Sequence, residues 1–381
     1  MSNLRIELLS GAYALPEADW QSLDTANDPF VSRAFLGIAE ETGAAGEDLA
    51  WRPMHCALRG ADGHIAGLLP LYLRHHSFGD FSHDWQWAAA WRQAGLDYYP
   101  KLVTGVPYTP SPGPRLLLSR SAAPGVAAEL VHSTIALARE TGASSWQCLF
   151  ARDTDLAALR DAGLILRRGV QFHWLNRGYR DFADFLDTLT ADRRKKIRRE
   201  QRAVAEAGLR IEVRHGDSLD ADLWAAVHAH YRDTFLRHGN HPAYSAAFFQ
   251  RVGQALGPRM VVFLAWQGDR PAASAICYRN DTTLFGRHWG TAVACPGLHF
   301  DLCYYRGIEY AIAEGLQRFE PGAGGEHKLA RGFEPVSTWS AFWIADARMR
   351  TLLARHLARE DGAVLDYQAE LARHLPYKTG G

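Results

Sequence analysis

Two stretches of the chain, residues 54–74 and 260–280, share one pattern of apolar and polar positions. Each has an apolar run, a short turn containing Asp-Gly or Gly-Asp, and a second apolar run. Such a turn between two apolar runs is typical of a β-hairpin, because Gly and Asp tolerate the backbone angles that a tight connection needs. We therefore expect one hairpin in each half of the chain.

The segments that follow the two hairpins also correspond. Residues 125–150 and 298–320 each have apolar positions at the helical period, followed by a strand-like run. Further along, a glycine and a tryptophan recur 169 residues later (332 − 163 and 343 − 174), in the pairs Gly163/Gly332 and Trp174/Trp343. The shared spacing indicates two copies of one α/β unit.

The repeat predicts an α/β fold with two tandem domains, the first over residues 1–178 and the second over residues 179–381. Residues 347–375 have the spacing of one or two amphipathic helices, which are expected to pack on the body of the protein as a C-terminal tail. The second domain also contains the most unusual charge pattern of the chain, within residues 190–208.

That segment, TADRRKKIRREQRAVAEAG, predicts a strongly basic helix. Seven basic residues lie between positions 193 and 202, against the single acid Glu200. Thr190 or Asp192 can cap its N-terminus. One interpretation is a solvated face balanced by acids elsewhere. The other, which we favour, is contact with a polyanion, because seven like charges on three turns repel one another unless an anion is bound.

Polar and aromatic side chains gather at a predicted strand end and at the start of the next helix, within residues 284–312. In an open α/β sheet this is where ligands bind. The residues concerned are Arg287, His288, Trp289, His299, Tyr304 and Tyr305. Taken singly, each is equally consistent with a core aromatic or a hydrogen-bonded surface residue.

A second candidate is the segment PGAGGEHKLARGF, residues 321–333, in which glycines surround Glu326, His327 and Lys328, with Arg331 shortly after. The equivalent part of the first copy, ARDTDLAALRDAG, has no Glu-His-Lys triplet. Reactive side chains that are present in one copy and absent from the other are expected when a function is added to a duplicated fold. Glycine would also let the backbone approach a ligand closely.

Composition narrows the class of protein. A chain with 47% hydrophobic and 22% charged residues and a net charge of zero is an ordinary globular protein without a global field toward nucleic acid or membrane. No apolar run approaches the roughly 18 residues of a membrane span, and no secretory signal is recognisable. Five cysteines without a CxxC pair suggest a reducing compartment, so we expect a cytoplasmic protein.

Metal binding and covalent catalysis are not expected. Cys295, His299 and Cys303 are spaced by four, but Pro296-Gly297 interrupts the helix that would align them, and there is no obvious fourth ligand. Nucleophile elbows of the GxSxG type and phosphate loops of the GxxxxGKS type are absent from the sequence.

The chain resembles the FemAB-like proteins of the GNAT (N-acetyltransferase) superfamily, a group associated with peptidoglycan biosynthesis or recognition. The motifs that carry the resemblance run along nearly the whole chain: PFVSRAFL, PLYLRHHSFGDFSHDWQWA, YYPKL, PYTPSPGPRLL, QFHWLNRGYRDFADFL, RRKKIRRE, GRHWG, LHFDLCYYRGIEYAI and GAGGEHKLARGFEP. The resemblance implies two tandem GNAT-like domains and an acyltransferase that acts on an amine. In the related Fem enzymes the donor is aminoacyl-tRNA and the acceptor is a peptidoglycan precursor.

The sequence departs from the GNAT pattern at one position. Enzymes that use acyl-CoA carry an Arg/Gln-x-x-Gly-x-Gly/Ala loop that holds the pyrophosphate at a helix start. The corresponding stretch, TAVACPGLHFDLCYY, lacks it. The main hypothesis is therefore an acyl- or aminoacyltransferase with no tightly bound cofactor and with aminoacyl-tRNA or acyl-CoA as co-substrate. The alternatives are an acyl-CoA-dependent N-acetyltransferase and a non-catalytic module that binds a cell-wall precursor or an anionic partner.

Aminolysis needs a base for the amine and support for the negative charge on the donor carbonyl. Under the main hypothesis, Glu326 or His327 is the base, Lys328 or Arg331 gives electrostatic support, and Tyr304 is a proton donor to the leaving group. The acceptor side is expected to be lined by Arg287, His288, Trp289, His299 and Tyr305. Donor phosphates, including those of a tRNA, are expected to bind Lys195, Arg198 and Arg199 on the basic helix.

Overall fold

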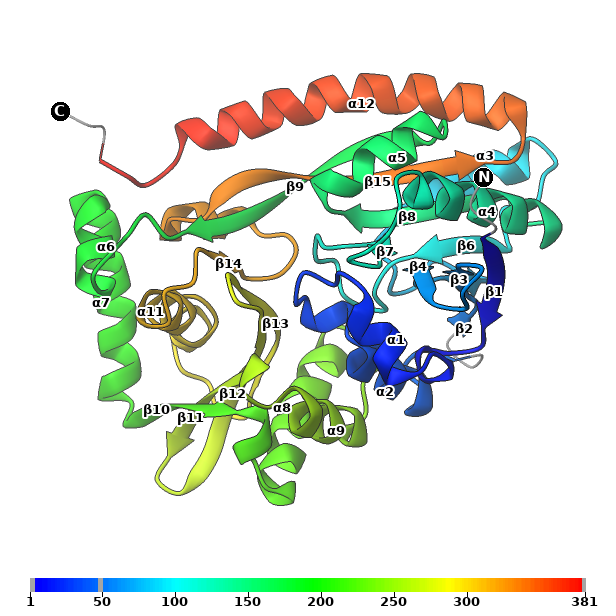
Figure 1. Ribbon diagram of the computed structural model, residues 1–381. Coiled ribbons are helices and arrows are strands. Elements are labelled where there is room, and N and C mark those ends of the chain that lie inside the picture. Colours follow the sequence, from blue (N-terminus) through cyan, green and yellow to red (C-terminus); the bar gives the residue numbers. More distant parts are fainter. Residues whose placement is uncertain (1–3, 47–50, 379–381) are drawn as a thin grey trace. The chain divides into compact units, whose positions relative to one another are not determined.

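The computed structural model describes residues 4–46 and 51–378, which form two compact units (Figure 1). The first unit comprises Met1–Gly169 and Ser337–Leu365, and the second comprises Val170–Val336 and Asp366–Gly381. The chain passes from one unit to the other within strand β9 (Ile165–Leu175) and returns within strand β15 (Glu334–Ile344). A single boundary at residue 178 therefore differs from these units in two segments. Residues 170–178 belong to the second unit, and residues 337–365 belong to the first.

The first unit contains two sheets, β1-β3-β4-β7 and the run β15-β8-β6-β5-β2. Its strands are β1 (Arg5–Leu9), β2 (Arg52–Pro53), β3 (His55–Arg59), β4 (Ile65–Leu69), β5 (Tyr72–Arg74), β6 (Lys101–Thr104), β7 (Leu117–Leu118) and β8 (Ser145–Ala151). Its helices are α1 (Glu17–Ser22), α2 (Arg33–Glu41), α3 (Trp85–Gln93), α4 (Val126–Glu140) and α5 (Leu156–Asp161). The antiparallel pair β3–β4 confirms the first predicted hairpin.

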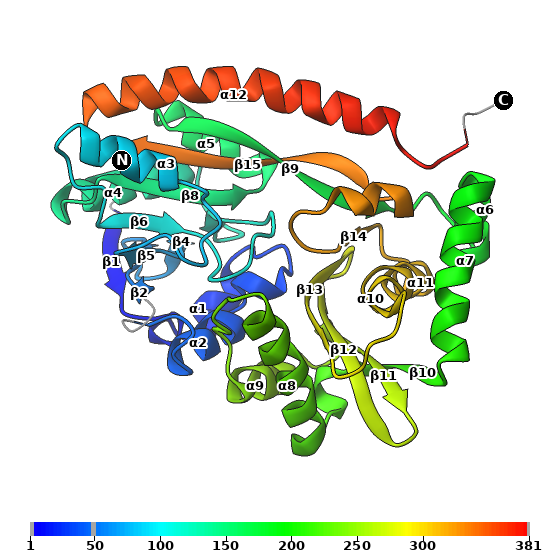
Figure 2. The same ribbon diagram turned by 180° about the vertical axis from the view of Figure 1, so that it is seen from behind.

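The second unit is built on the sheet run β10-β11-β12-β13-β14-β9. Its strands before β15 are β10 (Leu209–His215), β11 (Met260–Gln267), β12 (Arg270–Arg279), β13 (Thr283–Thr291) and β14 (Arg318–Glu320), and the pair β11–β12 confirms the second hairpin. Its helices are α6 (Phe182–Thr188), α7 (Ala191–Glu206), α8 (Ala221–Arg237), α9 (Ala246–Leu256), α10 (Leu298–Phe300) and α11 (Arg306–Ala313). Helices α8 and α9 lie on one face of β12 and β13, and α10–α11 on the other (Figure 2).

Strands β9 and β15 reproduce the sequence repeat, since they have the same length and begin 169 residues apart (334 − 165). Their partners are exchanged. Strand β9, from the first half of the sequence, pairs with β14 of the second unit, whereas β15, from the second half, pairs with β8 of the first unit. Each unit is thus completed by the last strand of the other repeat, which the repeat alone does not predict.

Each unit has its own hydrophobic core, and the C-terminal tail is one helix. That helix, α12, spans Ala347–Arg373, which confirms the predicted helical tail. Its side chains Met349, Leu353 and Leu357 are buried in the part that belongs to the first unit, and Leu371 joins the core of the second.

The close packing of α8 on β13 gives a test of the second unit. A Cβ at Gly290 would lie 1.9 Å from the backbone oxygen of His230, so Gly290→Ala forces the strand and helix apart. We expect a loss of about 3 kcal/mol in the free energy of unfolding by urea. The control Gly362→Ala lies in α12 with open space around its Cβ and should be neutral or stabilising by about 0.5–1 kcal/mol. Equal stability of the two variants would contradict this packing.

Candidate functional site

The site begins where two parallel strands separate. Strand β13 runs for nine residues, but its parallel pairing with β14 in the described chain covers only Thr283–Phe285 against Arg318–Glu320. Beyond this point, Gly286–Trp289 of β13 and Pro321 after β14 line a pocket with a cavity volume of about 80 Å³. The open end of a parallel strand pair is a common ligand position in α/β sheets.

The opposite wall of the pocket is a helix with an irregular turn. Between α10 and α11, residues Asp301–Tyr305 form a π-helical segment, so the helix is continuous from Leu298 to Ala313 but changes its side-chain phase. Two residues of this segment, Cys303 and Tyr304, line the pocket. Single π-helical turns inside α-helices are frequent at functional sites.

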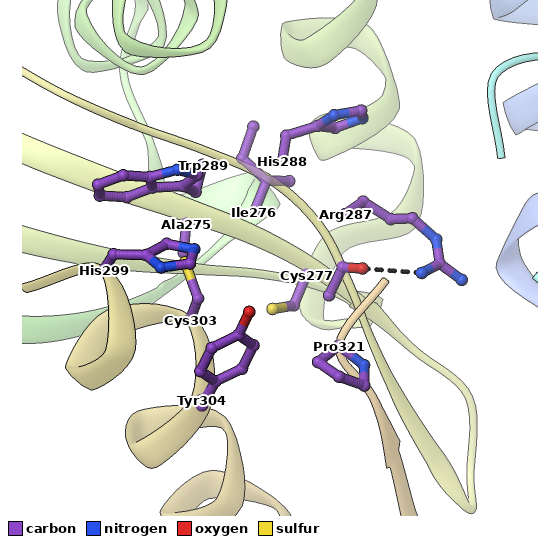
Figure 3. Close-up of a pocket in the computed structure, with 11 residues that line it drawn as sticks. Ala275, Ile276, Cys277, Arg287, His288, Trp289, His299, Cys303, Tyr304 and Pro321 are labelled. Atoms are coloured by element: carbon purple, nitrogen blue, oxygen red, sulfur yellow. Dashed lines mark hydrogen bonds between the residues drawn. The ribbon is translucent and has the colours of Figure 1, made fainter. Parts of the chain in front are cut away.

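Five of the residues predicted from the sequence line this one pocket: Arg287, His288, Trp289, His299 and Tyr304 (Figure 3). Sequence reasoning missed the contribution of β12, from Ala275, Ile276 and Cys277, and those of Cys303 and Pro321. The apolar run of the second hairpin was a signal for β12, but it does not reveal which face of that strand meets a ligand.

Tyr304 and His327 form the central polar pair. The Tyr304 hydroxyl lies 2.9 Å from His327 Nε2, with Tyr304 only 4% exposed and His327 at the surface. Burial raises the pKa of Tyr304, so the phenol keeps its proton. Burial, followed by the charges of Lys328 and Arg331, lowers the pKa of His327 and favours its neutral form. A protonated phenol therefore faces an imidazole able to accept its hydrogen bond.

The two histidines that line the pocket, His299 and His288, are neutral near pH 7. Burial, with smaller effects from nearby cationic groups, lowers the pKa of His299 to about 4, and its ring lies 4.7 Å from that of Trp289. Burial lowers the pKa of His288 to about 3. The His288 ring is surrounded by aromatic rings of α8, α9 and the segment between them, including Tyr231 at 4.9 Å and Phe249 at 5.7 Å.

Lys328 is buried behind the pocket. It is 3% exposed, and its Nζ donates to the backbone oxygen of Gly322 at 2.6 Å, which fixes the glycine-rich segment after β14. Burial, followed by the charge of Arg287, lowers the pKa of Lys328 to about 7. Arg287 itself donates to the Gly286 carbonyl at 2.7 Å and lies 3.4 Å from the buried carboxylate of Glu320.

Tyr305, expected to line the acceptor side, and Arg331, expected to give electrostatic support there, both contact helix α7. Arg331 is 3% exposed and pairs with Glu200 at 3.1 Å, while its Nε donates to the Tyr305 hydroxyl at 3.1 Å. The Tyr305 hydroxyl donates to Glu200 as well. Glu326 lies at the surface, where the Tyr367 hydroxyl donates to its carboxylate at 2.6 Å. Neither Arg331, Tyr305 nor Glu326 belongs to the pocket lining.

The predicted basic helix is α7, and its two sides differ. Glu200 faces inward to Arg331, and Arg194 is half-buried, with its Nη1 donating to the Leu189 carbonyl. The other six cations are exposed and have no ion-pair partner in the described part of the chain: Arg193, Lys195, Lys196, Arg198, Arg199 and Arg202. Between Arg193 and Arg202 the exposed side of α7 is therefore cationic, and the exposed acids of the helix, Asp192 and Glu206, lie at its two ends.

Within residues 4–46 and 51–378, no group of three or more His, Cys, Asp or Glu side chains is arranged as a metal site. Over the same residues, every helix is too short or too polar to cross a bilayer.

The solved structures that resemble the chain include the following three. The C-terminal domain (DUF2156) of a putative lysylphosphatidylglycerol synthetase from Agrobacterium fabrum aligns over 91% of this chain and 96% of its own, with 12% identity and a TM-score of 0.53. L-PGS from Bacillus licheniformis aligns over 84% and 94%, with 11% identity and a TM-score of 0.50. FemX aligns over 82% and 93%, with 12% identity and a TM-score of 0.48.

At these identities the likenesses concern the fold, which is that of two tandem GNAT-like domains. No curated protein matches the sequence. A family model described as peptidoglycan biosynthesis/recognition matches residues 12–379, nearly the whole chain. With this match, the predicted family is confirmed: the protein belongs to the FemAB-like family.

Proposed function

We propose that the protein transfers an activated acyl or aminoacyl group to an amine acceptor in the pocket of the second unit. Membership of the FemAB-like family supports acyl or aminoacyl transfer as the general class of activity. The observation that carries the proposal is the 2.9 Å contact between Tyr304 at the pocket and His327 at the surface. It joins a group that can reach the reacting amine to a group that can exchange a proton with water.

In this mechanism the acceptor amine attacks the carbonyl carbon of the donor. Tyr304 takes a proton from the amine as it passes its own proton to His327 Nε2, so the phenol never accumulates as a phenolate. The bond to the leaving oxygen or sulfur then breaks, and the same pair returns the proton to the leaving group. No covalent enzyme intermediate is needed, consistent with the lack of a nucleophile elbow.

The remaining groups of the site have supporting roles in this proposal. Trp289 and His299 form an uncharged wall for the acceptor, and Arg287 and Lys328 raise the positive potential near the developing oxyanion. Between the two bases considered from the sequence, His327 is preferred to Glu326. The carboxylate of Glu326 bonds to Tyr367, whereas His327 bonds to the pocket residue Tyr304.

The donor is proposed to be aminoacyl-tRNA, with acyl-CoA as the alternative. Six exposed, unpaired cations along α7, counted over the described residues, suit a polyanion better than a small phosphate group. Lys195, Arg198 and Arg199 remain the proposed phosphate contacts. The acceptor is proposed to be a peptidoglycan precursor, in keeping with the description of the family.

The role of α7 is tested by donor binding at several salt concentrations. A charged tRNA at about 100 times its Kd should add roughly 2.7 kcal/mol to the stability and raise the melting temperature. Neutralising Lys195, Arg198 and Arg199 to alanine should reduce the slope of log K against log salt by about 2 to 3, because three phosphate contacts are lost. The control changes three exposed arginines of α12, Arg350, Arg355 and Arg359, and should keep the slope. A salt-independent shift with acyl-CoA alone would contradict the tRNA assignment.

The proton-transfer pair is tested by turnover. His327→Ala and Tyr304→Phe should lower kcat by about 10²–10⁴-fold while donor binding is retained. His327 must be neutral to accept a proton, and its pKa is lowered. Wild-type activity should therefore persist below pH 6.5 and fall only as the pH drops through that lowered value. Transfer from labelled charged tRNA to a peptidoglycan precursor is the measurement, with the exposed His374→Ala as control. Undiminished turnover in His327→Ala would exclude this pair as the proton carrier.

The lowered pKa of Lys328 predicts how the free energy of unfolding depends on pH. Its pKa is about 7 in the folded protein and 10.5 in the unfolded chain, so between these values the unfolded state binds more protons. The stability contributed by Lys328 is therefore full above pH 10.5 and is lost as the pH falls toward 7. The stability of the wild type relative to Lys328→Met should rise by about 2 kcal/mol from pH 7 to pH 9, measured by urea unfolding. A constant difference would mean that the amine is not desolvated.

A further inference from the structure

Between Arg193 and Arg202, helix α7 carries one acid, Glu200, and that acid faces the protein interior. Glu200 is half-buried, while the flanking Arg198 and Arg199 are exposed. The backbone of α7 at Glu200 also touches the start of α10, since a Cβ at Gly297 would lie 3.0 Å from the Glu200 carbonyl oxygen. The cationic helix is therefore packed directly on the helix that forms one wall of the pocket.

The partner of Glu200 is Arg331, whose guanidinium is used entirely within the protein. Its Nη2 pairs with Glu200 at 3.1 Å and 3.2 Å, and its Nε donates to Tyr305. Its Nη1 donates to the backbone oxygen of His327 at 2.9 Å. The plane of the guanidinium lies 3.4 Å from the centre of the Phe300 ring, which fixes its orientation. All three nitrogens of Arg331 thus have partners, and one of them holds the residue that carries the proton.

The segment with His327 needs such a restraint. It is a short 3-10 helix, Glu326–Arg331, with a glycine in the left-handed conformation at each end, Gly325 at φ 90° and Gly332 at φ 87°. Glycine at both ends allows the segment to pivot with little conformational cost. Arg331 opposes this by joining the far end of the segment to α7 and to the His327 carbonyl.

From this geometry we propose that Arg331 and Glu200 are positioning residues that link the polyanion-binding helix α7 to His327. Arg331 contacts neither donor nor acceptor. It keeps the His327 imidazole in register with Tyr304, and Glu200 keeps Arg331 in place. A donor bound to the exposed side of α7 is thereby held by the same helix that orients the proton carrier. The inference rests on the proposed function for its catalytic meaning.

A purely structural role for the Arg331–Glu200 ion pair would have different consequences from a positioning role. Buried ion pairs contribute little net stability compared with apolar replacements, but they fix geometry, and removing one partner leaves an uncompensated charge. A structural role predicts a loss of stability with an intact site in whatever protein remains folded. A positioning role predicts a folded protein that binds donor but transfers poorly.

The experiment compares Arg331→Gln, Glu200→Gln and the double variant with Arg279→Gln as a control. Arg279 forms a more exposed ion pair with Glu314 at 2.8 Å in the same unit and is not part of the pocket lining, so Arg279→Gln controls for the loss of an arginine–glutamate pair away from the site. We expect kcat for transfer from charged tRNA to fall about 100-fold in Arg331→Gln, the loss typical of a 1 Å misplacement, with donor Kd unchanged within twofold. The double variant should be no worse than Arg331→Gln, because both changes break one link.

A second measurement does not depend on turnover. The bond from Tyr304 to His327 Nε2 predicts that the neutral imidazole carries its proton on Nδ1, which nitrogen NMR of the side chain reports. Arg331→Gln and the milder Glu200→Gln should convert this single tautomer to a mixture, and Arg279→Gln should not. A wild-type protein that neither binds nor consumes charged tRNA would overturn the proposed function alone. A single Nδ1–H tautomer retained in both folded variants would overturn the positioning role, as would unchanged kcat.

Discussion

The candidate site depends on the short parallel pairing between β13 and β14. The antiparallel strand β12 pairs with β13 along its length on one side, but only three residues of β13 pair with β14 on the other. The parallel strands β13 and β14 are joined by a helical crossover, and their pairing stops where β14 ends at Glu320. The separation leaves strand backbone and side chains from Gly286 to Trp289 facing a pocket instead of a neighbour. Every proposed catalytic group lies at this opening or is anchored to a segment beside it.

The first unit contains a corresponding parallel pair. Its strands β6 and β8 also join three residues on each strand. Beyond them, the chain folds back on β8: Arg115 Nε donates to the Leu149 carbonyl at 2.7 Å, and the Gly113 amide donates to the Phe150 carbonyl at 3.1 Å. These two backbone acceptors past the end of the strand pair are therefore satisfied by the protein itself, whereas in the second unit the corresponding stretch of β13 lines the pocket.

Much of this arrangement is predictable from the sequence, and the failures have identifiable causes. Hairpins, the basic helix and the grouping of Trp289, His299 and Tyr304 follow from local patterns. The exchange of β9 and β15 does not, because repeated strands have similar surfaces and either partner satisfies the hydrophobic pattern. Tyr305 was expected at the pocket beside Tyr304, but adjacent helical residues point in different directions, and the π-helical turn changes the phase. Local periodicity carries no signal for such an insertion.

The net charge of the chain and the local charge on α7 give different information about binding partners. A net charge of zero gives no indication of a polyanion, yet the exposed side of α7 is cationic between Arg193 and Arg202 because the one acid of that stretch, Glu200, faces inward. The sequence shows that Glu200 is present but not which way its side chain points. That orientation decides whether the exposed side of α7 is cationic between Arg193 and Arg202. The same inward carboxylate compensates the charge of Arg331, which would otherwise be buried alone near His327. In the proposed function, this one ion pair leaves the outer side of α7 open to an anionic donor and restrains the segment that carries His327, so donor binding and proton transfer would share a single structural support.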